Sequence, residues 1–554
     1  MKLRGARILV EELIRQGVDT VFGYPGGAVL DIYDELYKCS DRIHHVITAH
    51  EQGACHAADG YARASGKTGV VIATSGPGAT NLVTGIANAN LDSVPLVAIT
   101  GNVAVSALGR DSFQEVDIVG ITQPVVKYNF MVRSVDELEE TIKAAFKLAN
   151  TGRKGPVLID IPKNVQVGEY EYGEAREPEI PEKPKLEYRR DEVLRVIRGA
   201  RRPFIYCGGG VISSGAEEEL MELSRRLDAP IGLSMMGRTA VPDSYEYNLG
   251  MCGMHGNYVS TKAQSECDLM IAVGVRFSDR ATGDIKEYTR KCEVIHIDID
   301  KSELGKNVHP DLRVQGDVKE ILRDLLRDIA PQYHPQWRKA IEEFRKVPAA
   351  EPSREGEFIP KNIIRTVRKH LNDDTVVATD VGQHQMWTCQ FYDFEKPRTL
   401  LTSGGLGTMG YGLGAAIGGC LASGRKRTLL VTSEGSFGMN LNELCTVVSQ
   451  KLPITVLVLD NGVLGMVRQW QGIFYGKRYS ETTLNRKTDF AKLAEAFGAN
   501  GCHVKDLAGL EQVLEKIDRE PDGAWVIDCA IDKDEKVFPM IPPGRSIKDV
   551  ILKD

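Results

Sequence analysis

Residues 428–471 read TLLVTSEGSFGMNLNELCTVVSQKLPITVLVLDNGVLGMVRQWQ, and this stretch decides the fold class of the chain. Residues 429–431 form a short apolar run, and a second apolar run follows over residues 454–459. Between them, leucine and valine recur at helical spacing over residues 441–448. Parallel strands need a crossover connection of this length. The stretch therefore predicts a parallel strand–helix–strand unit in an α/β domain.

Each predicted strand of this unit ends in a polar turn. The first turn carries Glu434, Gly435 and Ser436, and the second carries Asp460 and Asn461. The carboxyl ends of parallel strands lie at the sheet edge where open α/β folds bind ligands. Carboxylate, amide and carbonyl oxygens are the ligands that Mg²⁺ prefers, and Mg²⁺ shares its coordination shell with substrate phosphates. The two turns therefore predict a site for Mg²⁺ and a phosphate group.

Composition limits the remaining classes of protein. The 554 residues indicate about three domains, and a net charge of −7 disfavours non-specific nucleic-acid binding. No run approaches the ~20 apolar residues of a membrane span. The N-terminal residues resemble an amphipathic helix rather than a signal peptide. The eleven scattered cysteines contain no C-x-x-C pair, which suits a reducing cytoplasm and no zinc knuckle. From the charge and the lack of a span we expect no binding to nucleic acid or membranes.

Apolar runs alternate with helical patterns along most of the chain, which predicts three doubly wound parallel-sheet domains. Two stretches rich in proline and charge lack this periodicity and resemble linkers. The expected boundaries are residues 1–168 for an N-terminal domain, 169–190 for a linker, 191–335 for a central domain, 336–360 for a second linker, 361–534 for a C-terminal domain and 535–554 for a tail. We expect the tail to cover the active site as an irregular lid.

Two features of the central domain suggest a nucleotide. A predicted strand over residues 203–207 leads into Gly208, Gly209 and Gly210, where a backbone could approach a pyrophosphate. The signal is weak because the glycines do not follow the G-x-G-x-x-G pattern. Asp298 ends another predicted strand, where an acidic residue can contact a ribose.

Several motifs, spread over essentially the whole chain, resemble one family. They are HEQG (residues 50–53), FQE (113–115), GMHG (253–256), GGLGTMG (404–410) and GMVRQWQ (465–471). Together with the polar turns at residues 433–436 and 460–461, they resemble thiamine diphosphate (ThDP) enzymes, in particular the catalytic subunit of acetolactate (acetohydroxyacid) synthase. The resemblance implies decarboxylation of pyruvate and transfer of its two-carbon unit to a second pyruvate or to 2-oxobutyrate. This is the first common step of branched-chain amino acid biosynthesis.

The resemblance also assigns catalytic roles. An acidic residue in the first turn of a helix, such as Glu51, by itself only suits the helix dipole. In the family this glutamate contacts the aminopyrimidine of ThDP, and a carboxyl group there can promote proton transfer. The other catalytic residues implied are Phe113, Gln114, Lys163, Arg280 and Trp470. Arg280 would hold the carboxylate of the second 2-oxo acid, and Trp470 would shape the pocket for its alkyl group.

The cofactors implied are ThDP, Mg²⁺ and FAD. The metal ligands would be Glu434, Asn461 and Val463. The ThDP contacts would be Gly27, Gly382, Gln383, His384, Gly407, Met409, Gly435, Ser436, Met439, Leu464, Gly465 and Met466. The FAD contacts would be Arg153, Gly208, Gly209, Gly210, Met254, His255, Gly274, Arg276, Asp298, Ile299 and Asp317. A glycine or methionine in such a set is by itself more often structural, so the matching motifs carry these assignments.

In the family the two domains that face one cofactor belong to different subunits. We therefore expect a homodimer or homotetramer with active sites between subunits, and a small regulatory subunit is a candidate partner.

This chain departs from the family pattern at its centre. Ser433-Glu434-Gly435 replaces Gly-Asp-Gly, Asp460 replaces an asparagine, and Ser278 replaces an aspartate in the FAD motif. Two other functions therefore remain open: another ThDP-dependent carboligase or decarboxylase of 2-oxo acids, and a weakly active paralogue that binds a partner subunit. Retention of Glu51, Gln114, Arg280 and Trp470 favours acetolactate synthase.

Overall fold

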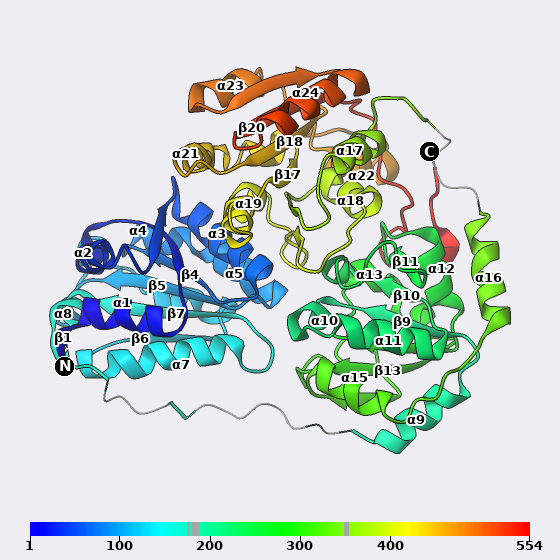
Figure 1. The fold of residues 1–554 in the computed structure, drawn as a ribbon, viewed down its shortest axis with the longest axis horizontal. Helices are drawn as coiled ribbons and strands as arrows, with labels where there is room; N and C mark the ends of the chain where they lie inside the picture. Colours follow the sequence, from blue (N-terminus) through cyan, green and yellow to red (C-terminus); the bar gives the residue numbers. More distant parts are fainter. Residues whose placement is uncertain (174–177, 180–185, 187, 348–353, 554) are drawn as a thin grey trace.

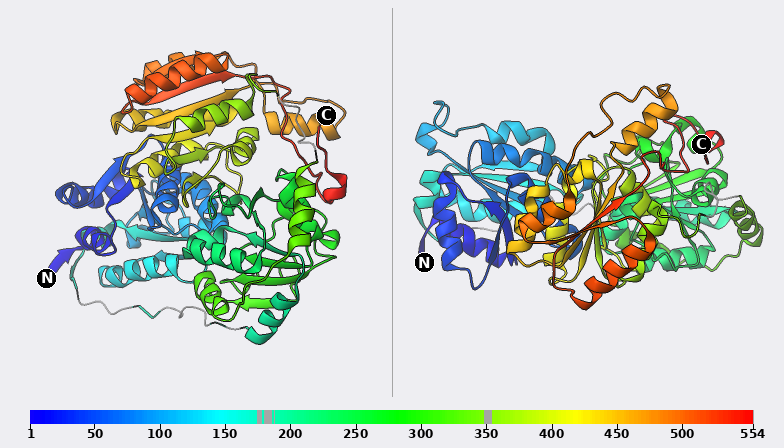
Figure 2. Two further views of the ribbon diagram at one scale, coloured as in Figure 1. Left: turned by 45° about the vertical axis from the view of Figure 1, so that its right-hand side comes forward. Right: turned by 90° about the horizontal axis from the view of Figure 1, so that it is seen from above.

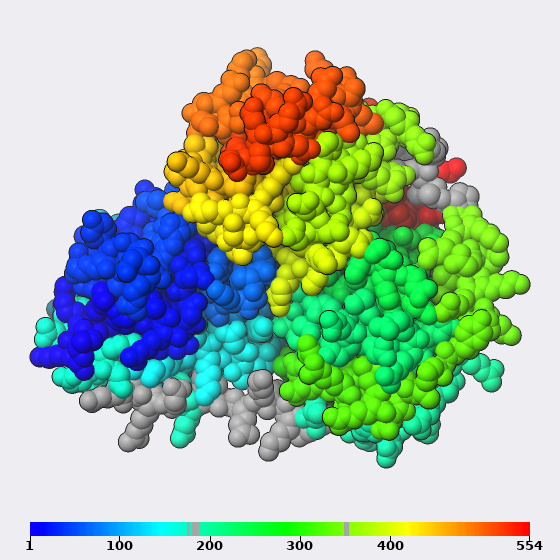
Figure 3. Space-filling model, viewed as in Figure 1, coloured from blue at the N-terminus to red at the C-terminus, as the bar shows by residue number. Residues whose placement is uncertain are grey.

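The computed structural model describes residues 1–173, 178–179, 186, 188–347 and 354–553. It contains three parallel sheets of six strands each, flanked by helices, which confirms the predicted α/β architecture (Figure 1). Among the described residues, no helix is long and apolar enough to cross a membrane. The three domains lie at the corners of a triangle in the space-filling view (Figure 3).

The N-terminal sheet has the strand order β3-β2-β4-β5-β7-β6. Its strands are β2 (Thr20–Tyr24), β3 (His44–Ile47), β4 (Gly69–Ala73), β5 (Leu96–Asn102), β6 (Tyr128–Met131) and β7 (Pro156–Pro162). One face packs on α1 (Gly5–Arg15), α2 (Leu30–Lys38) and α7 (Leu138–Asn150), whereas the other packs on α3 (Glu51–Ser65) and α5 (Val83–Asp92). Shorter helices are α4 (Pro77–Asn81), α6 (Ile118–Thr122) and α8 (Lys163–Val167).

The C-terminal sheet has the order β16-β15-β17-β18-β20-β19. Its strands are β15 (Val376–Thr379), β16 (Leu400–Leu401), β17 (Thr428–Thr432), β18 (Ile454–Asp460), β19 (Asn500–Val504) and β20 (Trp525–Ala530). β17 pairs in parallel with β18, which confirms the predicted strand–helix–strand unit. The helices are α17 (Pro360–Lys369), α18 (Gln383–Phe391), α19 (Tyr411–Ala422), α20 (Glu434–Phe437), α21 (Leu444–Ser449), α22 (Gly465–Phe474), α23 (Phe490–Phe497) and α24 (Leu507–Arg519).

The central sheet has the order β11-β10-β9-β12-β13-β14, so its strands run third, second, first, fourth, fifth and sixth in the chain. This is the strand order of dinucleotide-binding folds. The strands are β9 (Pro203–Cys207), β10 (Ile231–Leu233), β11 (Asn248–Met251), β12 (Leu269–Val273), β13 (Glu293–Asp298) and β14 (Leu312–Gln315). Helices α9 (Arg190–Gly199), α10 (Gly209–Ser214), α11 (Glu217–Leu227), α12 (Tyr258–Glu266), α13 (Asp279–Thr282), α14 (Ile285–Tyr288) and α15 (Val318–Leu326) surround it.

One hydrophobic core joins the N-terminal and C-terminal domains. Helices α3 and α19 pack side by side between the two sheets (Figure 1). At two points their backbones approach closely: a Cβ added to Gly418 would lie 1.8 Å from the carbonyl oxygen of Ala57, and one added to Gly60 would lie 2.3 Å from that of Ala415. Only glycine permits so close an approach. The two helices therefore hold the two sheets at a fixed separation.

The structure differs from the expected linkers in two places. Strand β8 (Glu169–Glu171) opens the first predicted linker and pairs antiparallel with β1 (Lys2–Arg4), with an ion pair of 3.0 Å between Lys2 and Glu169. Helix α16 (Pro335–Arg345) occupies most of the described part of the second. The Trp337 side chain of this helix is buried and donates to the carbonyl of Pro203 over 3.0 Å. Pro335 starts the helix, where its missing N–H is not needed.

The C-terminal tail is largely irregular and crosses from the C-terminal domain to the central one (Figure 2). Val537 exchanges hydrogen bonds with the side chain of Gln469 in α22, at 2.9 and 3.0 Å. Further along, Ile541 donates its N–H to the carbonyl of Met254 over 2.9 Å. The tail thus connects α22 with the central domain. The prediction that it acts as a lid remains a prediction.

Candidate active site

Asp380 organises the carboxyl edge of the C-terminal sheet. It directly follows β15 and is fully buried. Its carboxylate accepts hydrogen bonds from the N–H groups of Gly410 and Gly412, each over 2.9 Å, and from the hydroxyl of Thr432 over 2.8 Å. These bonds tie the end of β17 and the start of α19 to the end of β15. Burial raises the pKa of Asp380.

Glu434 lies at this edge as a buried carboxylate without a hydrogen-bond partner. Its residue is 6% exposed, and neither carboxylate oxygen receives a hydrogen bond of good geometry. Burial, together with the negative charge of Asp460, raises the pKa of Glu434 to about 8, while the nearby amides of Val463 and Asn461 oppose this shift. An unsatisfied buried carboxylate is unfavourable unless a cation or another ligand approaches it.

The turn after β18 faces Glu434. The side-chain oxygen of Asn461 accepts the N–H of Val463 over 3.2 Å. Val463 pairs with Thr483 in an isolated antiparallel bridge. On either side of it, the backbone N–H of Leu464 donates to the carbonyl of Thr482 and that of Leu484 donates to the carbonyl of Gly462. In such an antiparallel pair, the N–H and C=O of the central residue both point away from the partner strand. The carbonyl of Val463 therefore points to the same side as the Asn461 side chain.

These oxygens fit a magnesium ion that shares its shell with a phosphate. Glu434, Asn461 and the carbonyl of Val463 are hard ligands, but they fill only part of an octahedral shell. Across the described part of the chain, no group of three or more His, Cys, Asp and Glu side chains could hold a metal alone. A cation held here would complete its shell with water or with phosphate oxygens.

The predicted diphosphate residues gather beside this edge. Gly382 has φ of +154°, and a Cβ there would lie 2.8 Å from the imidazole of His384. Burial lowers the pKa of His384 to about 3, and its Nε2 atom has no partner. The amide of Gln383 donates to Gln469 over 3.0 Å and accepts from Asn461 over 3.4 Å. A neutral imidazole with one open ring nitrogen is suited to a hydrogen bond with a ligand.

Apolar side chains form the next part of the site. A Cβ on Gly435 would lie 2.9 Å from Leu464 and 3.9 Å from Met409, so both side chains lie beside the turn. Two other predicted residues are glycines: Gly407 has φ of +72°, and a Cβ added to Gly465 would collide with the side chain of Gln383. The hydroxyl of Ser436 donates to the carbonyl of Val381 over 3.1 Å. Met466 is half-buried, whereas Met439 is exposed.

The N-terminal domain brings a second group of predicted residues together. The carboxylate of Glu51, at the start of α3, accepts a hydrogen bond from Asn81 over 2.9 Å. Lys163 lies 3.5 Å from the carbonyl of Gly27 and pairs with Asp31 over 2.5 Å. The backbone of Gln114 lies against Gly76, in the turn after β4. These residues thus surround the carboxyl edge of the N-terminal sheet.

Phe113 stands out in this group because its side chain is 87% exposed. The hydrogen bond of Glu51 stays within its own domain, and the described contacts of one chain do not join it to Glu434 or Asn461. We call the N-terminal group and the C-terminal group the two half-sites.

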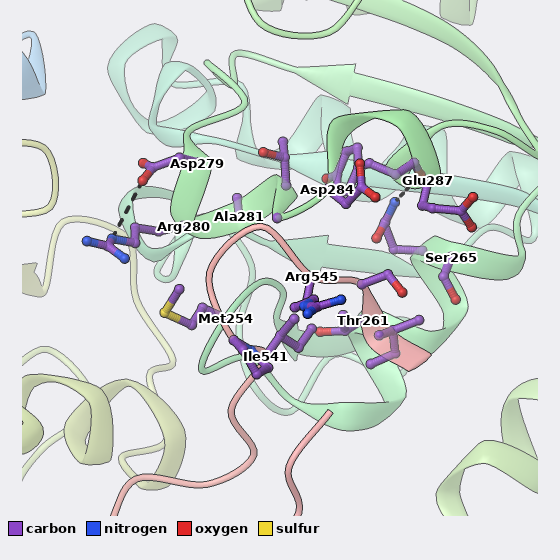
Figure 4. A pocket seen from close by; sticks show the side chains of 17 residues that line it. Met254, Thr261, Ser265, Asp279, Arg280, Ala281, Asp284, Glu287, Ile541 and Arg545 are labelled. Atoms are coloured by element: carbon purple, nitrogen blue, oxygen red, sulfur yellow. Dashed lines mark hydrogen bonds and ion pairs between the residues drawn. The ribbon is translucent and has the colours of Figure 1, made fainter. Parts of the chain in front are cut away.

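Arg280 and Trp470, predicted to bind the second substrate, do meet. They come from the central and C-terminal domains, and the guanidinium carbon of Arg280 lies 5.4 Å from the centre of the Trp470 ring. Arg280 also pairs loosely with Asp279. Figure 4 shows Arg280 and Met254 beside a small cavity, about 40 Å³ in volume, that Ile541 and Arg545 of the tail also line. The guanidinium remains largely exposed.

The predicted FAD residues divide into two sets. Gly208 and Gly210 pack against the backbone of Gly274, where added Cβ atoms would lie 2.0 and 2.6 Å from it, and Gly209 faces Met236. The side chain of Asp317 caps α15 by accepting the N–H of Lys319. These residues have structural roles that do not require a nucleotide.

The second set has features that suit a ligand. Burial raises the pKa of Asp298 to about 6, and the neighbouring Ile299 is half-buried. Burial lowers the pKa of His255, next to Met254, to about 4, and its Nδ1 atom is unpartnered. Arg276 donates to the carbonyl of Leu91, and Arg153 pairs with Glu303 over 2.9 Å.

Asp92 is a residue that the sequence motifs did not single out. Its buried carboxylate accepts from the N–H groups of Gly404 and Gly405, over 3.0 and 2.8 Å, and pairs with Arg63 over 2.9 Å. It thereby holds the loop that carries Met409. Asp380 was also missed, although an acidic residue at the end of an apolar strand is the same signal that identified Asp298.

All three domains match models of one family. Residues 3–121 match the N-terminal TPP (thiamine pyrophosphate) binding domain of thiamine pyrophosphate enzymes, residues 190–325 match the central domain, and residues 380–529 match the C-terminal TPP binding domain. The chain belongs to the thiamine pyrophosphate enzyme family, and thiamine pyrophosphate is another name for ThDP.

Curated relatives extend over nearly the full chain. It is 42% identical to a probable acetolactate synthase large subunit of Methanocaldococcus jannaschii, covering 99% of this chain and 95% of that protein. It is 42% identical to an acetolactate synthase of Mycobacterium bovis, covering 99% and 91%. A large subunit of acetolactate synthase from Buchnera aphidicola is 40% identical, covering 100% and 99%.

Proposed function

We propose that this chain is the catalytic subunit of a ThDP-dependent acetolactate synthase. It would decarboxylate pyruvate and join the two-carbon unit to a second pyruvate, giving 2-acetolactate, or to 2-oxobutyrate, giving 2-aceto-2-hydroxybutyrate. The observation that carries this assignment is the meeting of Arg280 and Trp470 at the edge of a ThDP-type site. A cation beside an aromatic wall suits a substrate that has a carboxylate at one end and a short alkyl group at the other.

The C-terminal half-site would hold Mg²⁺ and the cofactor diphosphate. Glu434, Asn461 and the Val463 carbonyl would bind the metal, while Gln383 and His384 would bind the diphosphate. Met409 and Leu464 would support the middle of the cofactor. When bound, ThDP supplies the thiazolium carbon that accepts the acyl unit and stabilises the negative charge left by decarboxylation. The longer side chain of Glu434, compared with aspartate, favours weaker Mg²⁺ binding and tolerance of Mn²⁺.

The N-terminal half-site would act on a cofactor bound by another copy of the chain. Glu51 would hydrogen-bond the aminopyrimidine ring and promote proton movement there. The exposed Phe113, with Gln114 and Lys163, would line the substrate pocket. The separation of the two half-sites within one chain supports a homodimer or homotetramer, because a second copy would complete each site.

The central domain would bind FAD in a structural role. Its dinucleotide-type strand order and the open nitrogen of His255 support this proposal. Arg153 of the N-terminal domain would lie along the cofactor with Arg276 and Asp298 of the central domain. Arg276 donates to the carbonyl of Leu91 and Arg153 pairs with Glu303, so these two contacts join the two domains. The large-subunit names of relatives make a small regulatory subunit a candidate partner. The eleven free thiols favour a cytoplasmic location.

The test is product formation from pyruvate by the purified chain, with Mg²⁺, ThDP and FAD each omitted in turn. We expect acetolactate that disappears without ThDP or metal. Arg280→Lys keeps the charge but loses the planar fork, so acetolactate should fall by about 10- to 100-fold while pyruvate is still consumed. Acetaldehyde as the main product of the wild type would identify a decarboxylase instead. No turnover and no ThDP binding would favour the weakly active paralogue.

A further inference from the structure

Glu443 is a buried carboxylate in the crossover between β17 and β18, the unit that carries the metal half-site. It ends the short helix η6 (Leu441–Glu443) and is 0% exposed. Its carboxylate accepts the N–H of Ala49 over 3.1 Å and the N–H of His50 over 3.0 Å. The hydroxyl of Thr446 donates to it over 2.6 Å. Glu443 thus connects the C-terminal domain to the N-terminal domain.

The two amides that Glu443 accepts directly precede Glu51. His50 is the N-cap of α3, and its ring accepts the N–H of Gln52 over 3.0 Å. A Cβ added to Gly53 would lie 2.2 Å from the Glu443 carboxylate, so the first turn of α3 presses on this side chain. The chain leading into Glu51 is therefore held by one side chain of another domain.

This arrangement holds the backbone that leads into Glu51 without using the Glu51 carboxylate. A carboxylate that accepts two backbone N–H groups makes charge-assisted bonds, which are shorter and stronger than neutral ones. These bonds act on residues 49 and 50, whereas the Glu51 carboxylate accepts its one described side-chain hydrogen bond from Asn81. Burial raises the pKa of Glu443, and the hydrogen bonds from Thr446, Ala49 and His50 oppose this shift.

We propose that Glu443 is a positioning residue that sets the place of Glu51 through the amides of Ala49 and His50. The inference rests on the proposed function, since it assumes that Glu51 acts on ThDP. The segment between β17 and β18 would then have two roles. It would carry metal ligands at its ends, and through Glu443 it would hold the start of α3 in position. Positional errors of about 1 Å can cost roughly 100-fold in rate, so loss of this support should affect proton movement.

The test compares Glu443→Gln with the wild type by exchange of the C2 proton of bound ThDP, measured by NMR at saturating ThDP and Mg²⁺. Glutamine keeps the size but removes the charge and turns an NH₂ group toward N–H donors. We expect exchange and kcat to fall about 10- to 100-fold, with the KM for pyruvate and the affinity for ThDP changing less than about threefold.

A double-mutant cycle with Glu51→Gln separates positioning from general destabilisation. If Glu443 acts through Glu51, then adding Glu443→Gln to Glu51→Gln should cause no further loss of exchange. Thr446→Val removes one hydrogen bond to Glu443 without touching α3, and it should lower exchange by about two- to fivefold. This milder variant keeps the test valid if Glu443→Gln fails to fold.

The proposal is overturned if Glu443→Gln lowers ThDP affinity or stability while exchange at saturation stays normal. It is also overturned if the losses in the double variant multiply. Either result leaves the proposed function intact, because the wild type would still exchange the proton and form acetolactate. Absence of exchange in the wild type would instead contradict the proposed function itself.

Discussion

The N-terminal and C-terminal sheets share one topology, but a buried carboxylate at the edge of each sheet has different hydrogen bonding. In both, the strands run second, first, third, fourth, sixth and fifth along the sheet. At the carboxyl edge of the N-terminal sheet, the Asp160 carboxylate receives hydrogen bonds from Thr100 over 2.7 Å and from Asn102 over 2.6 Å. At the corresponding edge of the C-terminal sheet, Glu434 receives none of good geometry.

The difference shows how one architecture makes either a closed or an open site. Burial raises the pKa of Asp160 to about 7, and that of Glu434, assisted by Asp460, to about 8. The first carboxylate is satisfied by its own domain. The second has no partner of good geometry among the described residues, and the oxygen atoms around it suit a divalent cation.

The largest effect should follow from Glu434→Ala, which removes the open carboxylate. We expect acetolactate formation at fixed Mg²⁺ to fall on the order of 1,000-fold, because the metal supplies several kcal/mol of charge stabilisation. Glu434→Gln, which keeps the size without the charge, should lose nearly as much. Isothermal titration with Mg²⁺ and ThDP measures the binding directly, and unchanged metal binding in the alanine variant would exclude Glu434 as a ligand.

Asp160, whose carboxylate is satisfied by its own domain, should affect the stability of the fold rather than metal binding. Because the pKa of Asp160 rises from 3.8 to about 7 on folding, the folded protein takes up a proton between these values. The contribution of Asp160 to the free energy of unfolding is largest below pH 4, falls as the pH rises to 7 and is constant above that pH. The total loss is up to roughly 4 kcal/mol. Asp160→Asn should remove this dependence in urea unfolding at pH 4.5, 6 and 8. A variant whose stability still declines in parallel with the wild type would contradict it.

Removing one hydrogen-bond donor of Asp160 should leave its carboxylate partly unsatisfied, as that of Glu434 is. Thr100→Val deletes a hydroxyl that donates to Asp160, and it should lower stability by about 1–2 kcal/mol at pH 8. The loss should shrink at pH 4.5, where the carboxyl group is protonated. Thermal unfolding at both pH values measures this, with Mg²⁺ activation as the control that must not change.

The smallest effect should come from Glu434→Asp, which restores the shorter carboxylate of the family pattern. We expect the Mg²⁺ concentration for half-maximal activity to fall about two- to fivefold, since aspartate reaches the ion with less displacement of the turn. The selectivity for Mg²⁺ over Mn²⁺ should rise with it. An identical metal titration for both proteins would mean that the turn already compensates for the longer side chain.

The strands that bear the site could be predicted because they are buried on both faces and therefore uniformly apolar. An edge strand such as β6 (Tyr128–Met131) is short and half-exposed, so its residues carry no uniform apolar signal. Helix α16 was missed because its only fully buried apolar positions are Trp337 and Ile341, within an otherwise charged segment.

Half-sites were predictable, but the connections between domains were not. Glu434, Asn461 and Gln383 lie near one another because they follow neighbouring strands of one sheet. The meeting of Arg280 with Trp470, and the support of Ala49 by Glu443, depend on how separate domains pack, which periodicity does not encode. The family resemblance anticipated the first pair but gave no indication of the second.

The backbone contact between α3 and α19 limits how this molecule can change. Because a side chain at Gly60 or Gly418 would collide with a backbone carbonyl of the other helix, these two positions tolerate no enlargement. The N-terminal and C-terminal domains should therefore move together as one rigid body. For engineering, the same contact means that neither domain can be exchanged for that of a relative unless the partner helix is transplanted with it.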